Sequence, residues 1–173
     1  LSEALEIKEE LILWRRSLHR IPEVGLILPE SFRFVTEQLE RMGITYKTYT
    51  GHSGIVADFG NGQGKTVAIR GDMDGLPIEE DTGLEFSSEN KNMHACGHDA
   101  HTAMVLTLAE YAAEHLAELP RNVLFLFQPS EETTGGAGKL CESGVLERYR
   151  VRRIFGLHLW PGLEAGTIAS RPG

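Results

Sequence analysis

The stretch that decides the fold is Val123-Leu124-Phe125-Leu126-Phe127, an apolar run without a polar interruption. A half-exposed strand alternates apolar and polar residues, so an unbroken run predicts a strand covered on both faces. Thr66-Val67-Ala68-Ile69 and Ile154-Phe155-Gly156-Leu157 predict two more short buried strands, and helical patterns at residues 99–117 and 136–146 lie between the three. This alternation predicts an α/β fold with a mainly parallel sheet flanked by helices.

The first third of the chain predicts elements that precede this alternation. Residues 4–20 and 30–42 carry apolar residues at helical spacing among charged ones, which predicts two amphipathic helices. Gly43 is the expected residue just past the end of the second helix. Residues 44–59 predict two short strands, and a turn is expected at residues 61–64.

Composition limits the class of protein. A chain of 173 residues suits one domain with a sizeable core. A net charge of −8 without a basic block argues against nucleic acid or an anionic membrane as a partner. No apolar run approaches the roughly 18 residues that span a bilayer, and the first residues do not resemble a signal peptide. Two cysteines exclude a disulfide framework, so we expect a cytoplasmic protein.

Polar side chains of the types that bind metals follow the three predicted strands and precede the first of the two helices. In chain order these residues are Asp72, Asp74, Cys96, His98, Glu131, Glu132 and His158. The carboxyl ends of parallel strands meet at one edge of a sheet, and a crossover helix starts from that edge. We therefore expect all of these side chains at a single rim.

The residue types at this rim suit a divalent metal. Thiolate, imidazole and carboxylate together favour zinc or another first-row ion. Gly97 lets the backbone turn so that Cys96 and His98 can face one centre. Asp99 is a candidate N-cap for a helix beginning at Ala100, or a residue that orients a ligating imidazole.

The adjacent pair Glu131 and Glu132 favours hydrolysis. Neighbouring residues of an extended segment point to opposite sides, so one carboxylate can bind metal while the other faces a water molecule. Metal-assisted hydrolysis needs this division, because the metal lowers the pKa of water and a separate base removes the proton.

Each candidate also has an ordinary structural interpretation. A Glu-Glu pair is commonly solvated, a lone cysteine is commonly inert, and Asp72 and Asp74 suit a turn. His158 fits a hydrogen-bonded core histidine, whereas His94 and His101 fit a loop and a helix start. The agreement of several independent clusters favours the metal site over these alternatives.

Two other catalytic motifs are rejected. The glycine-rich residues 135–138 lack the Lys-Ser/Thr pair of a phosphate-binding loop, because Leu140 follows Lys139. Cys96 and His98 are too close in sequence to form an oriented nucleophile and base, and no clear third partner follows, which argues against a thiol protease.

Four blocks, at residues 70–77, 93–101, 127–132 and 156–161, resemble the signature blocks of the M20 metallopeptidase family and occur in the family's order. The resemblance is strongest to the amidohydrolase branch, which includes hippurate hydrolases, N-acyl-amino-acid amidohydrolases, auxin-conjugate hydrolases and N-acetyl-diaminopimelate deacetylases. Residues 18–23 and 170–173 resemble the same branch.

This resemblance implies roles for the candidate residues. Two divalent ions are implied, with zinc or manganese favoured and nickel or cobalt tolerated. The implied metal ligands are Cys96, His98, Glu132 and His158. Glu131 is implied as the general base and Asp74 as a carboxylate that supports the ligands. Asp72 replaces a metal-binding His of the wider family, with Cys96 as the compensating ligand, and the roles of Asp72, Asp99 and His101 stay open.

The resemblance also implies a domain arrangement. Residues 1–173 are expected to form the N-terminal portion of a catalytic domain, with a lid or dimerisation domain, a C-terminal catalytic segment and one further His ligand beyond Gly173. The isolated chain is therefore expected to be nearly inactive. The parent enzyme is expected to be a homodimer or homotetramer that hydrolyses the amide bond of small N-acyl amino acids. The alternatives are an aminopeptidase or dipeptidase of the same family and a metal-binding protein without catalysis.

Overall fold

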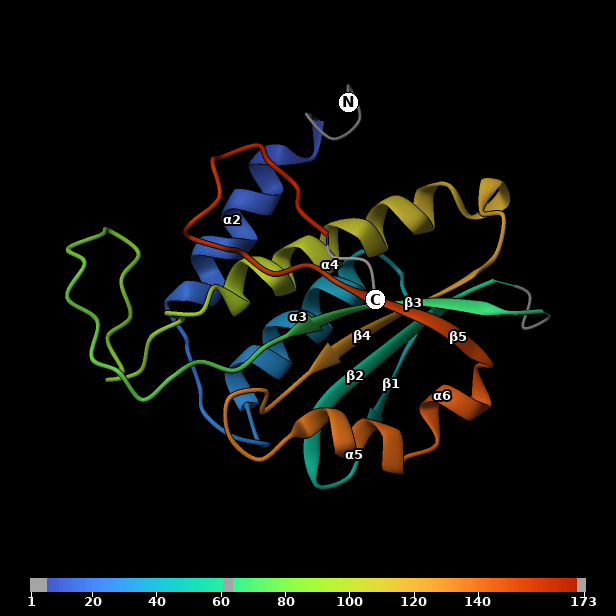
Figure 1. The fold of residues 1–173 in the computed structure, drawn as a ribbon, viewed down its shortest axis with the longest axis horizontal. Helices are drawn as coiled ribbons and strands as arrows, with labels where there is room; N and C mark the ends of the chain where they lie inside the picture. Colours follow the sequence, from blue (N-terminus) through green and yellow to red (C-terminus); the bar gives the residue numbers. More distant parts are fainter. Residues whose placement is uncertain (1–5, 61–63, 171–173) are drawn as a thin grey trace.

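The computed structural model describes residues 6–60 and 64–170 and contains a five-stranded sheet in the order β1-β2-β4-β3-β5 (Figure 1). The strands are β1 (Tyr46–Tyr49), β2 (His52–Phe59), β3 (Thr66–Asp72), β4 (Asn122–Gln128) and β5 (Val151–Gly156). As expected, β3 pairs in parallel with β4 and β5, whereas β2 pairs antiparallel with β1 and β4. The α/β class is confirmed, and its sheet is mixed. Residues 4–5 of the first predicted helix, 61–63 of the predicted turn and 171–173 of the last family-like block lie outside the described residues.

Helices cover both faces of the sheet (Figure 1). On one face lie α2 (Lys8–His19), α3 (Pro29–Arg41) and α4 (His98–Glu114), which is followed by the short 3-10 helix η1 (Leu116–Glu118). On the other face lie α5 (Gly136–Glu142) and α6 (Val145–Arg148), which replace the single helix predicted at residues 136–146. Within residues 6–60 and 64–170, no helix combines the length and the apolar character needed to cross a membrane.

The apolar run in β4 holds these layers together. Phe125 and Phe127 belong to the larger core cluster with α2, α3 and α4, whereas Leu124 and Leu126 belong to the smaller cluster with α5 and α6. None of the four is more than 4% exposed. Alternate side chains therefore enter opposite cores, and the prediction of a strand covered on both faces is confirmed.

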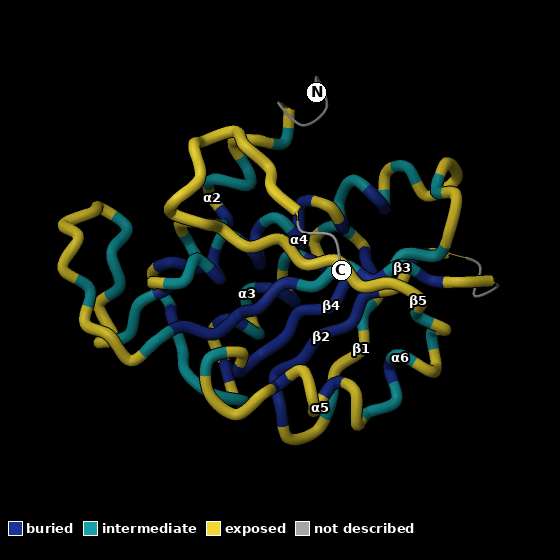
Figure 2. Tube along the Cα trace, in the orientation of Figure 1, coloured by how far each residue is buried: buried dark blue, intermediate teal, exposed yellow. Residues whose placement is uncertain are grey.

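The prediction that residues 154–157 form a buried strand is wrong. Strand β5 pairs only with β3, at the edge of the described sheet, and Ile154 and Phe155 are 50% and 55% exposed. Figure 2 shows β5 as a mostly exposed segment next to β3, whose residues are buried or intermediate, with the largely buried β4 on the other side of β3. An apolar run reports hydrophobicity, whereas burial depends on whether another element covers the strand.

A long segment between β3 and α4 projects from the body of the molecule (Figure 1). Its base is closed by paired backbone hydrogen bonds of 2.9 Å between Leu76 and Met93. Cys96 lies between this bridge and the start of α4, so the bridge between Leu76 and Met93 helps to place the thiol beside the first turn of α4.

Close packing of β3 against α4 sets the distance between the sheet and the helix that carries His98. A Cβ on Gly71 would lie 2.8 Å from Cγ2 of Val105 and 3.0 Å from the carbonyl oxygen of His101. We expect Gly71→Ala to lower the free energy of unfolding by about 1–3 kcal/mol in urea titrations, because α4 must move away. Gly138→Ala is the matched control, since no atom lies within 4 Å of a Cβ there. Equal stability of the two variants would contradict the close approach.

Candidate metal centre

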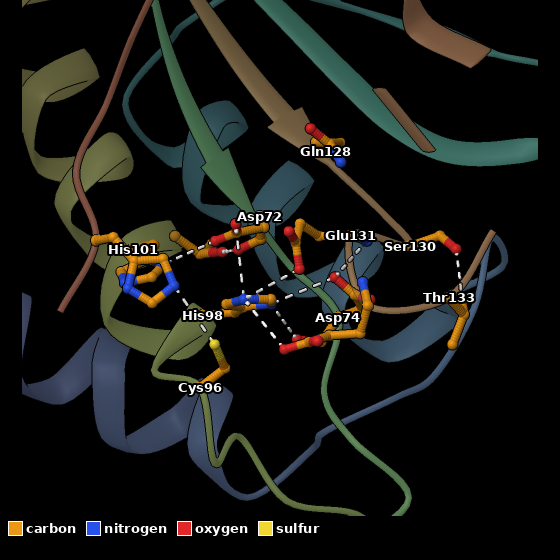
Figure 3. A network of polar contacts seen from close by, with 12 residues as sticks. Asp72, Asp74, Cys96, His98, His101, Gln128, Ser130, Glu131 and Thr133 are labelled. Atoms are coloured by element: carbon orange, nitrogen blue, oxygen red, sulfur yellow. Dashed lines mark hydrogen bonds and ion pairs between the residues drawn. The ribbon is translucent and has the colours of Figure 1, made fainter. Parts of the chain in front are cut away.

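The predicted convergence of polar side chains is present at the carboxyl edge of β3, β4 and β5 (Figure 3). The side chains come from the ends of these strands, from the loops that follow them and from the first turn of α4. Those that meet there are Asp72, Asp74, Cys96, His98, His101, Glu131, Glu132 and His158. Residues up to 86 positions apart in the sequence, from Asp72 to His158, thus lie close together because the parallel strands end at the same edge of the sheet.

His98 lies at the middle of this group. Its Nδ1–H donates to the carbonyl oxygen of Asp74 at 2.8 Å, so in the neutral ring the lone pair is on Nε2. This Nε2 is buried and has no hydrogen-bond partner among the described residues. Carboxylate oxygens of Asp72, Glu132 and Glu131 lie 3.6, 3.7 and 3.9 Å from it. A buried polar atom without a partner is costly, and a cation at this point would provide one.

Asp74 holds the two glutamates in place. Its Oδ1 accepts the main-chain N–H of Glu131 and its Oδ2 that of Glu132, each at 3.0 Å. Although burial opposes it, hydrogen bonds from His98 and from these two amides lower the pKa of Asp74. The extended geometry predicted for the glutamates is wrong, because Ser130 has a φ of 55° and a turn follows. Both carboxylates consequently face His98 instead of opposite sides.

Cys96 and His158 bring two more donor atoms to the same space. The Sγ of Cys96 lies 3.4 Å from Nε2 of His158, whose Nδ1–H donates to the carbonyl oxygen of Leu159 at 2.6 Å. In the neutral ring of His158 the proton is therefore on Nδ1 and Nε2 is directed to the centre, as in His98. Burial and the carboxylates of Glu132 and Glu131 raise the pKa of the Cys96 thiol to about 11. A divalent cation would reverse this effect, because it stabilises the thiolate.

Asp72 and His101 support the centre from the side of α4. The Nδ1–H of His101 donates to Asp72 at 2.7 Å, and its Nε2 accepts the N–H of Leu159 at 2.9 Å. Although burial opposes it, His101, His98 and Arg70 lower the pKa of Asp72 to about 2. Since both nitrogens of His101 are engaged, this residue anchors the segment that carries His158 and has no free ligand atom.

The donor set fits a metal centre. In each of three groups of residues, the potential ligand atoms lie within 4.8 Å of one another, and His98 belongs to all three groups. The groups are Cys96, His98 and His158; His98, Glu131 and Glu132; and Asp72, His98 and His101, although in the last group both nitrogens of His101 are already hydrogen bonded. Thiolate, imidazole and carboxylate suit zinc and similar divalent ions. The buried Nε2 of His98 and Oε1 of Glu132, both without hydrogen-bond partners among the described residues, are 3.7 Å apart and are available to such an ion.

The prediction that Asp99 caps a helix beginning at Ala100 is wrong. Helix α4 begins at His98, and the residue before it, Gly97, occupies the N-cap position with a φ of 88° and no side-chain cap. Asp99 therefore lies within the first turn, where its carboxylate contacts α2 instead of the helix amides.

His94 has an environment that the sequence does not reveal. It is 4% exposed, and neither ring nitrogen has a hydrogen-bond partner within the described part of the chain. Burial lowers its pKa to about 4, so the ring is neutral. The density of histidines in residues 94–101 is the signal that points to it, but spacing alone does not separate a buried neutral ring from a loop residue.

Comparison with known proteins identifies the family. The family described as Peptidase family M20/M25/M40 matches residues 68–173, which is more than half of the chain. The chain belongs to this family. It is 42% identical over 175 residues to the IAA-amino acid hydrolase ILR1-like 5 of Arabidopsis thaliana, covering 98% of this chain and 40% of that protein. It is also 42% identical over 172 residues to the N-acetyldiaminopimelate deacetylase of Exiguobacterium sibiricum, covering 95% and 45%.

A solved structure agrees with this assignment. The YXEP protein of Bacillus subtilis, described as a dinuclear metal binding peptidase from the M20 family, superposes with a TM-score of 0.89 and is 40% identical. The match covers 95% of this chain and 47% of that one. The family resemblance and the fold class predicted from the sequence are thereby confirmed. The M20 chain spans less than half the length of these three proteins.

The raised pKa of Cys96 predicts that metal uptake releases a proton. At pH 7 a thiol with a pKa of about 11 is protonated, and it must lose that proton to bind a divalent ion. We expect calorimetric Zn²⁺ titrations in buffers of different ionisation enthalpy to show about one more released proton for the wild type than for Cys96→Asp, whose carboxylate is already ionised. The same proton count in both proteins would show that Cys96 is not a ligand.

Proposed function

We propose that the protein hydrolyses the amide bond of N-acyl amino acids at a centre of two divalent ions, with zinc or manganese favoured. The observation that carries this proposal is the convergence of Cys96, Glu131, Glu132 and His158 around Nε2 of His98, which has no hydrogen-bond partner within residues 6–60 and 64–170. The names of two relatives, which refer to an amino acid conjugate and to a deacetylase, support the substrate class. The activity is proposed for the whole protein, to which residues 1–173 contribute the N-terminal part of the catalytic domain.

The proposed ligands are the residues whose donor atoms meet at the centre: two of these atoms, Nε2 of His98 and Oε1 of Glu132, have no hydrogen-bond partner among the described residues, and the other two, Sγ of Cys96 and Nε2 of His158, contact each other. His98 and His158 each donate from Nδ1 to a carbonyl oxygen and keep Nε2 for the ion. Glu132 has a buried Oε1 without a hydrogen-bond partner among the described residues, and Cys96 supplies sulfur. When bound, the divalent ions polarise a carbonyl group and lower the pKa of water.

Glu131 is the proposed general base. Its side chain is 42% exposed, compared with 20% for Glu132, so its carboxylate is open to water and substrate. Asp74 fixes the backbone of both glutamates and keeps the Glu131 carboxylate at the edge of the centre. Glu131 accepts a proton from the attacking water and delivers it to the nitrogen of the leaving amino acid, which then departs as an amine.

The substitution Glu131→Gln separates proton transfer from metal binding. In the full-length enzyme we expect kcat to fall by roughly 10²–10⁴-fold, because the amide cannot accept the proton, while bound metal stays near the wild-type amount. Glu132→Gln is the matched comparison and should lose metal. Turnover and metal content are measured on the same preparations. Near-normal turnover of Glu131→Gln would contradict the role of this carboxylate.

The metal-loaded, full-length wild-type enzyme tests the substrate class. N-acyl amino acids should be hydrolysed faster than dipeptides with a free amino group, since the proposed enzyme is an amidohydrolase. Preference for dipeptides would indicate an aminopeptidase or dipeptidase of this family. No hydrolysis of either class by a metal-loaded protein would indicate a metal-binding protein without catalysis.

A further inference from the structure

A buried group of charged side chains lies on the side of α4 that faces α2, away from the metal centre. Asp99 accepts from Nδ1 of His19 at 2.7 Å and from Nε of Arg15 at 2.8 Å with the same oxygen, Oδ2. The other nitrogen of His19, Nε2, donates to Glu80 at 3.1 Å. His19 and Asp99 are 2% and 1% exposed, and the side chain of Glu80 is fully covered.

The charges in this group balance. His19 donates from both ring nitrogens to carboxylates, and the hydrogen bond to Asp99 raises its pKa in spite of burial. Two cations, His19 and Arg15, therefore face two anions, Asp99 and Glu80. Buried ion pairs contribute little net stability compared with apolar packing, and in some proteins they instead specify one arrangement of the chain.

The arrangement that they specify is the rotation of the first turn of α4. His98 and Asp99 are consecutive on the helix, so their side chains point in directions about 100° apart. The hydrogen bond from His98 to Asp74 fixes one side of this turn, and the contacts of Asp99 with α2 fix the other. Gly97, with a φ of 88°, precedes the turn and provides no side-chain cap that would hold it.

We propose that His19 is a positioning residue for the metal ligand His98. By holding Asp99 against α2, His19 keeps the first turn of α4 at the rotation that directs Nε2 of His98 to the centre. This proposal rests on the proposed function, because it assumes that His98 binds metal.

The projecting segment between β3 and α4 also contacts His19 and its neighbours on α2. Glu80 accepts the main-chain N–H of Ser88 at 2.8 Å in addition to its bond from His19. The guanidinium groups of Arg15 and Arg16 lie 5.0 Å from the centre of the Phe86 ring. Through His19, the segment between β3 and α4 is therefore tied to the residue that follows His98.

Co²⁺ binding to the full-length protein tests the proposal, because its affinity and visible absorption report the ligand geometry without requiring turnover. We expect His19→Ala to weaken binding by roughly 10–100-fold and to alter the absorption bands, as loss of a supporting partner does at other metal sites. His19→Gln retains one donor to Asp99 and should recover part of both.

His52→Ala is the matched control. His52 is also a buried histidine, at 8% exposure. It accepts the N–H of Gly54 and stacks on Tyr49, and neither contact involves the charged group around His19. It should change stability without changing Co²⁺ affinity or absorption. If His19→Ala does not fold, Asp99→Asn keeps the side-chain volume and removes the charge, and it should weaken binding by about tenfold.

The outcomes separate the two proposals. Wild-type Co²⁺ affinity and absorption in the folded His19 or Asp99 variants would overturn the positioning role and leave the metal centre intact. Unchanged affinity in His98→Ala, or no binding by the wild type, would overturn the metal centre and the positioning role together. Equal loss in His52→Ala would show that the effect is general destabilisation, which also overturns the positioning role.

Discussion

The hydrogen bond from Nδ1 of His98 to the carbonyl oxygen of Asp74 is the interaction on which the centre depends. In the neutral ring it places the proton on Nδ1, and so it directs toward the carboxylates a buried Nε2 that has no hydrogen-bond partner in the described part of the chain. Asp74 accepts three hydrogen bonds. Its main-chain carbonyl accepts the bond from His98, and its two carboxylate oxygens accept the amides of Glu131 and Glu132. Asp74, a single residue in the loop after β3, thereby sets the relative positions of the candidate ligands from α4 and from the loop after β4.

The cost of this arrangement is electrostatic. Four carboxyl groups, from Asp72, Asp74, Glu131 and Glu132, surround the imidazole of His98. Together with burial, the carboxylates of Glu132, Glu131 and Asp72 also disfavour the thiolate form of Cys96. Hydrogen bonds from Arg70 and His101 to Asp72 offset part of the repulsion. A divalent cation would offset more of it, and because it binds only the folded chain, it would stabilise the fold as well.

The sequence predicts the features that depend on the hydrophobic pattern and on the order of strands and helices along the chain. The apolar run of β4 and the polar residues after each strand are enough to predict the α/β class and the rim where Cys96, His98 and Glu131 meet. It does not predict the exposure of β5, because neighbours in space determine it. The turn at Glu131 depends on a positive φ at Ser130, and the partners of Asp99 lie about 80 residues earlier on α2, so neither follows from local spacing.

The most direct test of the account is anomalous X-ray scattering, at the zinc absorption edge, from crystals of the full-length protein grown with Zn²⁺. The account predicts a peak about 2.0–2.1 Å from Nε2 of His98 and, for the ion that Cys96 binds, about 2.3 Å from its Sγ. A peak at some other place in the protein, with no density beside His98, would contradict the assignment of this edge of the sheet as the metal centre.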